Sequence, residues 1–236
     1  MICITIPTYN EKENIFKLIK RINKLKLSIK IVIVDDSKFP LINLDKFMNV
    51  KYIHRGKKLG RGSAVMMGIK SEINNRKNKI FIEMDADFSH NPNEIIRNLN
   101  YFSKHKLNFL IASRYLKKSK ILNWPLSRHL LSKISNILAR ILLGVPIKDY
   151  TNGFRFYDLT AAKHIIRNCK PSKSSGFIIL SEIALELYTN KFKIGEIHTM
   201  FVNRTRGESK ANFYEIFNSF LGILKIFLYK RILSNK

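Results

Sequence analysis

The chain has 236 residues, 45% of them hydrophobic and 11% aromatic. This is enough apolar material for a folded core, and it excludes an intrinsically disordered protein. Lys and Arg number 43 against 17 Asp and Glu, a formal net charge of +26. Such an excess attracts polyanions, so the favoured partners are nucleic acid, anionic lipid surfaces or phosphorylated substrates.

The two cysteines, Cys3 and Cys169, do not have the spacing of a metal site. We therefore expect free thiols and a reducing compartment. The first predicted strand begins at Ile2, and we expect no signal peptide before it.

Short apolar runs alternate with helical patterns over the first half of the chain. The predicted strands cover residues 2–6, 31–34, 50–54, 80–84 and 107–113, and the predicted helices cover 11–25, 63–73 and 92–104. This alternation predicts an α/β fold in which helices flank a mostly parallel, doubly wound sheet. We see no internal repeat and no linker, and we expect one domain with a C-terminal extension.

Three of these strands end in polar residues. The first runs into Pro7–Glu11, the second ends at Val34 before Asp35-Asp36, and the fourth leads into Asp85-Ala86-Asp87. Parallel strands deliver such groups to one edge of the sheet, where open α/β sheets bind ligands. Carboxylates there suit Mg²⁺ or Mn²⁺ carrying phosphates. A lone Asp-x-Asp is more often a polar turn, so the convergence of three strand ends carries the prediction of a nucleotide site.

A basic, glycine-rich turn covers residues 55–62, but it fits neither a P-loop nor a GxGxxG pattern. Residues 126–143 predict an amphipathic helix in which Arg128 and Ser132, four apart, share a face. Together with Arg114 they could bind a second phosphate. A solvated basic face explains the same spacing equally well.

The remaining segments are a polar loop at 149–155 before a helix, a single late strand at 193–204 and a basic loop at 204–210. Residues 213–233 are the most apolar part of the chain, but Lys225 interrupts them. That run is too short for a membrane-spanning helix and fits an in-plane interfacial helix. A helix packed on the protein's own core is the alternative.

Taken together, these motifs resemble the dolichol- (polyprenol-) phosphate mannosyltransferases, inverting glycosyltransferases of the GT-A fold. The resemblance runs in order from Ile2 to about Lys225. Its motifs are Ile6–Glu11, Val34–Ser37, Lys58–Gly60 with Gly62–Ala64, Met84–Asp87 with Ser89, His90 and Pro92, Ser113–Tyr115, Trp124, Arg128, Ser132, Asp149, Thr151, Gly153–Arg155, Gly176-Phe177, Glu182, Arg204, Gly207, Ser209 and Lys210.

The resemblance implies an enzyme that transfers mannose from GDP-mannose to dolichyl or polyprenyl phosphate with inversion. It implies catalytic roles for Asp85, Asp87 and Arg114, an acceptor-phosphate site at Arg114, Arg128 and Ser132, and a Mg²⁺ or Mn²⁺ ion at Asp87 and Ser89. The implied nucleotide-sugar contacts are Pro7, Tyr9, Glu11, Val34, Asp36, Asp85, Ala86, Asp87, Arg204 and Lys210.

The chain departs from the family pattern at two places. Lys38-Phe39-Pro40 stand where the family has Asp-Gly-Thr, and Ser89 stands at the third metal position, so we expect water to complete the metal's ligands. We expect a glycosyltransferase domain at 1–210 and a membrane-associating helix at 211–236. The expected location is peripheral, on the cytosolic face of the endoplasmic reticulum or of a prokaryotic plasma membrane.

The lipid would be reached through residues 213–233, through residues 126–143 or through a small membrane-anchoring subunit. The alternatives are a polyprenyl-phosphate glucosyltransferase using UDP-glucose, a basic nucleic-acid-binding protein and a catalytically silent scaffold. We expect no nucleic acid partner, because the aromatic residues are not interleaved with the basic ones and no RNP or zinc-finger pattern occurs.

Overall fold

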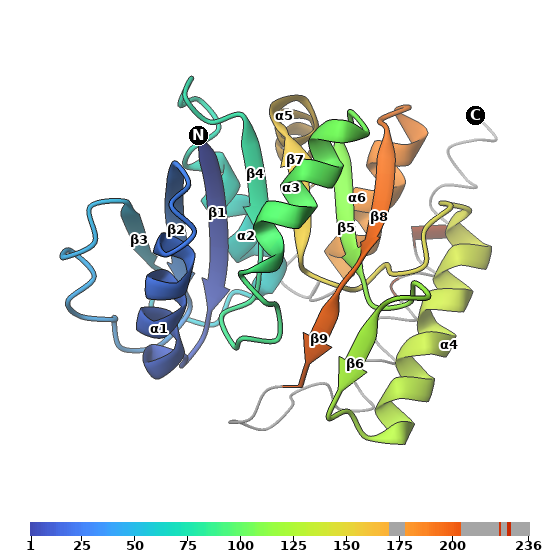
Figure 1. Cartoon of the computed structure of the whole chain (residues 1–236), viewed down its shortest axis with the longest axis horizontal. Helices are drawn as coiled ribbons and strands as arrows, with labels where there is room; N and C mark the ends of the chain where they lie inside the picture. Colours follow the sequence, from blue (N-terminus) through green and yellow to red (C-terminus); the bar gives the residue numbers. More distant parts are fainter. Residues whose placement is uncertain (170–177, 204–221, 223–225, 228–236) are drawn as a thin grey trace.

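The computed structural model describes residues 1–169, 178–203, 222 and 226–227. A seven-stranded sheet runs through the molecule in the order β3-β2-β1-β4-β7-β5-β8 (Figure 1). Its strands are β1 (Ile2–Thr8), β2 (Ile29–Asp35), β3 (Val50–His54), β4 (Ile80–Glu83), β5 (Phe109–Ser113), β7 (Arg155–Asp158) and β8 (Ile194–His198). The predicted α/β fold with a mostly parallel sheet is confirmed, and both cysteines are buried free thiols.

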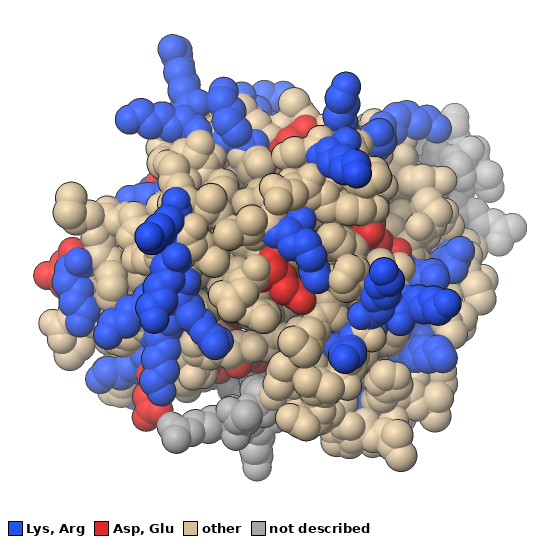
Figure 2. All heavy atoms as spheres, in the orientation of Figure 1, with Lys and Arg blue, Asp and Glu red and all other residues tan. Residues whose placement is uncertain are grey.

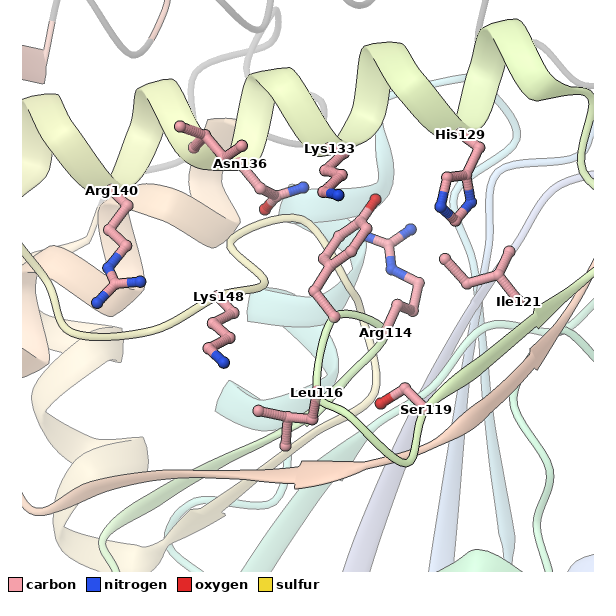
Figure 3. A pocket seen from close by; sticks show the side chains of 11 residues that line it. Arg114, Leu116, Ser119, Ile121, His129, Lys133, Asn136, Arg140 and Lys148 are labelled. Atoms are coloured by element: carbon pink, nitrogen blue, oxygen red, sulfur yellow. The ribbon is translucent and has the colours of Figure 1, made fainter.

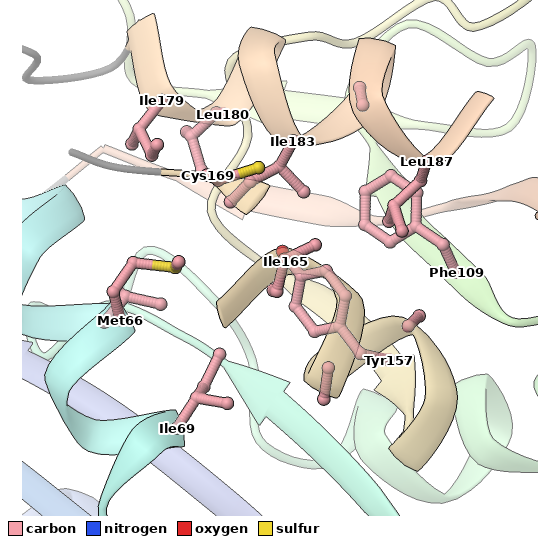
Figure 4. Packing of buried hydrophobic residues seen from close by; sticks show 14 of the residues in the cluster. Met66, Ile69, Phe109, Tyr157, Ile165, Cys169, Ile179, Leu180, Ile183 and Leu187 are labelled. Carbon is pink, nitrogen blue, oxygen red and sulfur yellow. The ribbon is translucent and has the colours of Figure 1, made fainter. Parts of the chain in front are cut away.

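Helices cover both faces of this sheet. Helices α1 (Lys12–Asn23) and α3 (Glu94–Lys104) lie on one face, and α2 (Arg61–Lys70), α5 (Leu159–Asn168) and α6 (Ile178–Thr189) lie on the other (Figure 1). Successive side chains of a strand point to opposite faces. In β1, Cys3 accordingly joins the cluster under α2 and α5, while Ile4 and Ile6 join the cluster under α1. Figure 4 shows the cluster under α2 and α5, in which Phe109 stacks on Tyr157 with their ring centroids 5.0 Å apart.

Strands β2, β1 and β4 are parallel neighbours, so their carboxyl ends meet at one edge of the sheet. The chain goes from β1 outward to β2 and β3 and then returns to place β4 on the other side of β1. A reversal of this kind opens a crevice at the strand ends, where ligands of doubly wound sheets bind. The predicted convergence of the three polar strand ends is confirmed.

Two predictions for the later chain were incomplete. The loop at 149–155 leads into β7, an antiparallel strand between β4 and β5, before α5 begins. Residues 193–204 do not form one strand, because β8 ends at His198 and β9 (Met200–Val202) leaves the main sheet. Between them, the Thr199 hydroxyl donates to Glu94 and the Thr199 carbonyl accepts from Lys120.

Strand β9 pairs with β6 (Lys120–Leu122) in a separate two-stranded sheet beside α4 (Leu126–Leu143) (Figure 1). Helix α4 buries Asn136, Ala139 and Leu143 and ends at Gly144, whose φ of 68° is typical of a helix C-terminus. Among the helices the structure describes, none has the length and apolar character needed to cross a bilayer.

Candidate active site

The loop after β4 brings Asp85 and Asp87 to the sheet edge, and a buried histidine holds it. The Asp85 backbone N–H donates to Nδ1 of His90 at 3.0 Å, so the other ring nitrogen, Nε2, carries the proton and donates to Oδ1 of Asn152 at 2.8 Å. Phe88 has a φ of 61°, rare for a bulky side chain and common only at constrained sites. This turn lets the Ser89 backbone N–H donate to Oδ1 of Asp87 at 3.1 Å.

Arg61, in the first turn of α2, binds three acceptors at the end of β4. Its Nε donates to Asp85 at 2.8 Å, its Nη1 to Glu83 at 3.2 Å and its Nη2 to the Gly153 carbonyl at 3.2 Å. Burial alone would lower the pKa of Arg61, but Asp85 and Glu83 raise it above its ordinary value. A Cβ at residue 153 would collide with this guanidinium, which explains the glycine.

The carboxylate at the end of β2 is already engaged. Asp36 accepts from Nε of Arg55 and from the backbone N–H groups of Leu59 at 2.8 Å and Gly60 at 3.0 Å. Gly60 has a φ of 95°, a conformation that favours glycine. Asp36 therefore fixes the basic turn against the sheet edge.

Other residues predicted to bind the nucleotide differ in accessibility. Tyr9 is half-buried, with Nζ of Lys58 5.6 Å from its ring centroid. Glu11 is half-buried and accepts from Asn14 at 2.6 Å. Pro7, Val34 and Ala86 are buried, so their side chains offer little surface to a ligand.

The donor set at the β4 end fits a divalent cation. Asp87 supplies carboxylate oxygens, and the neighbouring Ser89 Oγ is buried with no hydrogen-bond partner among the described residues. Hard oxygen ligands with water in the remaining positions suit Mg²⁺ or Mn²⁺. No cluster of three His, Cys, Asp or Glu side chains suited to a metal occurs in the described ranges, so the described residues alone do not build a closed cage there.

A second group of site residues follows β5. Arg114 forms a buried bidentate pair with Asp149, with Nε–Oδ2 at 2.8 Å and Nη2–Oδ1 at 2.7 Å, and it also donates to Thr151 at 2.6 Å. Burial would lower the pKa of Arg114 and raise that of Asp149. Their pairing reverses both effects, raising the first and lowering the second. The Nη1 group of Arg114 has no hydrogen-bond acceptor within the described part of the chain.

Aromatic rings gather the predicted phosphate ligands. The guanidinium carbons of Arg114 and Arg128 lie 5.3 and 4.4 Å from the Trp124 ring centroid. Ser132 accepts from the Tyr115 hydroxyl at 2.7 Å. The structure thus brings the three predicted residues together around two aromatic side chains. We call Arg114, Trp124, Arg128 and Ser132 the acceptor cluster.

Strand β9 connects the two halves of the site. The backbones of Phe201 and His90 form an isolated antiparallel β-bridge, and their ring centroids are 5.6 Å apart. The Phe201 ring centroid also lies 5.3 Å from the guanidinium carbon of Arg114. Asp85 also contributes, after Asp149, to the raised pKa of Arg114. The Asp-x-Asp loop and the acceptor cluster therefore share one electrostatic environment.

Three features of the candidate site were not predicted from the sequence: the contacts of Arg61, those of Asn152 and the ring contacts of Trp124. A signal for Arg61 was present, because a cation in the first turn of a helix opposes the helix dipole and needs a nearby carboxylate. Two predicted site residues, Arg204 and Lys210, lie outside the described residues, as does the predicted helix boundary at 210/211.

Comparison with known proteins adds a sequence relationship. The family model described as glycosyl transferase family 2 matches residues 3–166. A polyprenol monophosphomannose synthase of Mycolicibacterium smegmatis is 32% identical, over 89% of this chain and 80% of that protein. A dolichol-phosphate mannosyltransferase of Pyrococcus furiosus is 36% identical over 92% of this chain, which spans only 60% of that protein's length.

Solved structures agree on the fold. Glucosyl-3-phosphoglycerate synthase from Mycobacterium tuberculosis, in complex with Mn²⁺ and UDP, superposes with a TM-score of 0.61 at 14% identity, covering 98% of this chain and 79% of that one. TarS from S. aureus, in complex with UDP-GlcNAc, has a TM-score of 0.61 at 17% identity, covering 94% and 66%.

Proposed function

Because the chain belongs to glycosyl transferase family 2, we propose that it transfers mannose from GDP-mannose to a dolichyl or polyprenyl phosphate with inversion. The relatives named as mannose synthases support the sugar and the lipid class. The observation that carries the proposal is that Phe201 contacts both His90, which holds the Asp-x-Asp loop, and Arg114 of the acceptor cluster, so that one site can serve two anionic substrates.

On the donor side, Tyr9 and Glu11 at the β1 end hold the nucleotide in the crevice between β1 and β4. Asp85, oriented by Arg61, contacts the sugar. Arg204 and Lys210, which lie outside the described residues, are the remaining predicted contacts of the nucleotide sugar. Asp87 and Ser89, with water, would hold a divalent cation, which would supply charge neutralisation for the diphosphate. Two observations support this assignment: Asp87 supplies carboxylate oxygens, and Ser89 Oγ has no hydrogen-bond partner among the described residues. Mg²⁺ and Mn²⁺ both suit oxygen ligands of this kind.

On the acceptor side, Arg128 and the Nη1 group of Arg114 hold the lipid phosphate. The buried Nε1–H of Trp124, which has no partner among the described residues, provides a further donor toward an anion. Asp149 keeps the Arg114 guanidinium in place with two hydrogen bonds. These groups offset the repulsion between the two substrates and orient the phosphate oxygen.

The reaction needs no strong general base. A phosphate monoester has a second pKa of about 6, so the acceptor oxygen is already largely deprotonated at neutral pH. That oxygen forms a bond to the anomeric carbon on the face opposite the diphosphate. The bond from that carbon to the diphosphate oxygen breaks, and GDP leaves with the electron pair. The attack from the opposite face inverts the anomeric centre.

We place the protein at the cytosolic face of a membrane, where GDP-mannose and the lipid phosphate meet. The exposed apolar side chains of α4 support a membrane contact: Leu126 is 88% exposed and Ile141 is 71% exposed. A helix with such side chains lies in the plane of the interface. Residues 211–236 and a small anchoring subunit are further candidate contacts.

The proposal is tested by donor comparison. Radiolabelled GDP-mannose and UDP-glucose are supplied separately with polyprenyl phosphate, with Mg²⁺, with Mn²⁺ and with a chelator, and label in the organic phase is counted. We expect label from GDP-mannose with metal and loss of label with chelator. Label from UDP-glucose alone would assign the chain to the polyprenyl-phosphate glucosyltransferases instead, and metal-independent transfer would refute the cation site.

A further inference from the structure

Asn152, in the loop before β7, is 1% exposed, and each of its four polar groups forms a hydrogen bond. Its backbone N–H donates to Oδ1 of Asp149 at 3.0 Å, and its carbonyl accepts from Nε of Arg155 at 2.8 Å. Its side-chain Nδ2 donates to the Ala112 carbonyl, and its Oδ1 accepts from Nε2 of His90 at 2.8 Å. Such a residue is held in place, because moving it would leave buried polar groups unpaired.

The Ala112 carbonyl determines which way the Asn152 amide points. A carbonyl only accepts hydrogen bonds, so the amide nitrogen faces Ala112 and the amide oxygen faces His90. An oxygen at that place requires the proton of the imidazole to be on Nε2. The other nitrogen, Nδ1, is then an acceptor, and it accepts the Asp85 backbone N–H at 3.0 Å. Asn152 therefore selects the form of His90 that holds the Asp-x-Asp loop.

The same contacts join the two sides of the candidate site. Oδ1 of Asp149, which accepts the Asn152 backbone N–H, also accepts Nη2 of Arg114 at 2.7 Å. A continuous series of hydrogen bonds therefore runs from the Asp85 backbone through His90, Asn152 and Asp149 to the Arg114 guanidinium. The three residues in between are at most 1% exposed. Hydrogen bonds in such a low-dielectric interior are strong and directional, so the series restricts movement of the loop relative to Arg114.

Packing keeps the His90 ring from turning. The ring stacks on Phe154 with centroids 5.2 Å apart and planes 16° apart, and the Phe201 ring meets it at 69°. Next to these rings, the Val202 backbone N–H donates to the Ser89 carbonyl at 3.2 Å. A rotation of the imidazole would displace both aromatic rings, so His90 is a rigid spacer between the two loops.

The Arg114 end of the series reaches the acceptor side. Arg114 lines a cavity of about 360 Å³, together with Tyr115 and residues of α4. Figure 3 shows the Arg114 guanidinium pointing toward α4, close to Lys133. One end of the series is thus the loop that carries the candidate metal ligands, and the other end is the arginine proposed to bind the acceptor phosphate.

We propose that His90 and Asn152 are positioning residues, which hold the Asp-x-Asp loop at a fixed place relative to Arg114. Both are buried, so they act through the loop and through Asp149, not by contact with a substrate. The inference rests on the proposed function for the two substrates that these sides bind. A misplacement of about 1 Å between reacting groups can cost about 100-fold in rate, whereas the binding of either substrate alone does not depend on the distance between the two sides.

The first test is amide hydrogen exchange, followed by NMR on the full chain without substrate or metal. Asn152→Ala removes the amide that binds His90. Asn78→Ala is the matched control, since Asn78 is 0% exposed, donates to the Glu72 carbonyl at 3.2 Å and precedes β4 at the end away from Asp85. In Asn152→Ala we expect exchange of the Asp85 amide to accelerate at least about tenfold more than exchange of the β2 amides.

In Asn78→Ala we expect the Asp85 and β2 amides to accelerate by the same factor, because only the overall stability falls. Equal acceleration of the two in Asn152→Ala would overturn the proposal. His90→Asn gives an independent test, because its short side chain leaves an oxygen for the Asp85 N–H but does not extend to Asn152. We expect selective acceleration at Asp85 here too, and protection at the wild-type level would overturn the role of Asn152.

Transfer kinetics give the second readout. In Asn152→Ala we expect kcat for mannose transfer at least about tenfold lower, and a Kd for GDP, from equilibrium dialysis with Mn²⁺, changed less than about threefold. An unchanged kcat, or a loss confined to GDP binding, would overturn the positioning role. If wild type transfers no mannose, the proposed function fails, and the exchange measurements still decide whether His90 and Asn152 hold the loop.

Discussion

At the scale of single residues, the site depends on two pairs of arginine and aspartate, in each of which one member positions the other. Arg61 holds Asp85 against the end of β4, and Asp149 holds Arg114 in the acceptor cluster. Neither arrangement follows from the spacing of the motifs, because each joins residues more than twenty positions apart. Each gives a prediction that separates positioning from direct contact with substrate.

Replacing Arg61 with Gln removes the cation between Asp85 and the fully buried Glu83. We expect a free energy of unfolding lower by about 1–3 kcal/mol, because Glu83 loses a hydrogen-bonded partner. We also expect a raised KM for GDP-mannose, because Asp85 is no longer oriented, with a smaller change in the KM for the lipid. Steady-state kinetics and urea unfolding measure both effects.

The variant Arg61→Lys is the matched control, since it keeps the charge but offers one nitrogen where three nitrogens now donate. We expect the free energy of unfolding of Arg61→Lys to return close to the wild-type value, while its KM for GDP-mannose stays raised. If both variants change the KM for the lipid and the KM for GDP-mannose by the same factor, Arg61 supports the fold without orienting the donor site.

Replacing Asp149 with Asn leaves Arg114 buried beside a neutral partner. Breaking one side of a buried ion pair costs about 3–5 kcal/mol, and we expect a loss of that size at pH 7. Burial would raise the pKa of Asp149, but Arg114 holds it below its ordinary value. The stability that the pair contributes is therefore fully present above about pH 4, the unfolded pKa, and is lost as the pH falls through the lower folded pKa.

The difference between wild type and Asp149→Asn should therefore shrink below about pH 4. Chemical unfolding across a pH series measures it, with Asp45→Asn, at an exposed position, as the control. A difference that stays constant from neutral pH to strongly acidic pH would contradict the account of this pair.

At the scale of elements, α4 combines a buried edge with an outward apolar row. Leu130 is 60% exposed and Ile141 is 71% exposed, so replacing both with Glu should change the free energy of unfolding by less than about 1 kcal/mol. The same change should reduce binding to neutral phosphatidylcholine vesicles, because it places charge in the membrane interface. Vesicle flotation measures the binding.

Met48→Glu is the control for that variant, since Met48 is 96% exposed before β3, on the far side from α4 (Figure 1). We expect it to leave vesicle binding unchanged. Equal binding by the α4 variant and wild type would contradict a membrane contact through α4.

The sequence predicted the elements whose pattern is local. Strands β1 to β5 and helices α1 to α4 follow from apolar periodicity, with ends shifted by a few residues. Strand β7 was missed because its four residues, Arg-Phe-Tyr-Asp, do not form an apolar run as those of β4 do. Its antiparallel place in the sheet is set by tertiary contacts with β4 and β5. The break between β8 and β9 depends on hydrogen bonds from Thr199 to distant residues.

The candidate site was predicted to a similar degree. The gathering of Asp85, Asp87 and the β1 end follows from strand topology and needs no side-chain geometry. Strand topology does not predict that the basic turn binds Asp36. Nor does it predict that Asp149 and three aromatic rings enclose Arg114. These contacts come from loops whose conformations local sequence does not determine.

At the scale of the whole molecule, the chain carries a net charge of +26. On the face that Figure 2 shows, Lys and Arg lie on the side of α1, on the side of α4 and along the upper edge, and some Asp and Glu lie between these groups. This distribution suits an enzyme that brings two anionic substrates together at an anionic surface, because the positive field attracts both and the central carboxylates accept a cation. The central claim is that the β4 end holds the donor of a lipid-phosphate mannosyltransferase.

That claim is tested most directly by the initial rate of mannose transfer from GDP-mannose to polyprenyl phosphate, for wild type and for Asp87→Ala. Asp45→Ala, at an exposed position in the segment between β2 and β3, is the control. We predict metal-dependent transfer by wild type and the control, and a rate at least about a hundredfold lower for Asp87→Ala, because the carboxylate that would hold the charge-neutralising cation is lost. Transfer by Asp87→Ala at the wild-type rate would contradict the account.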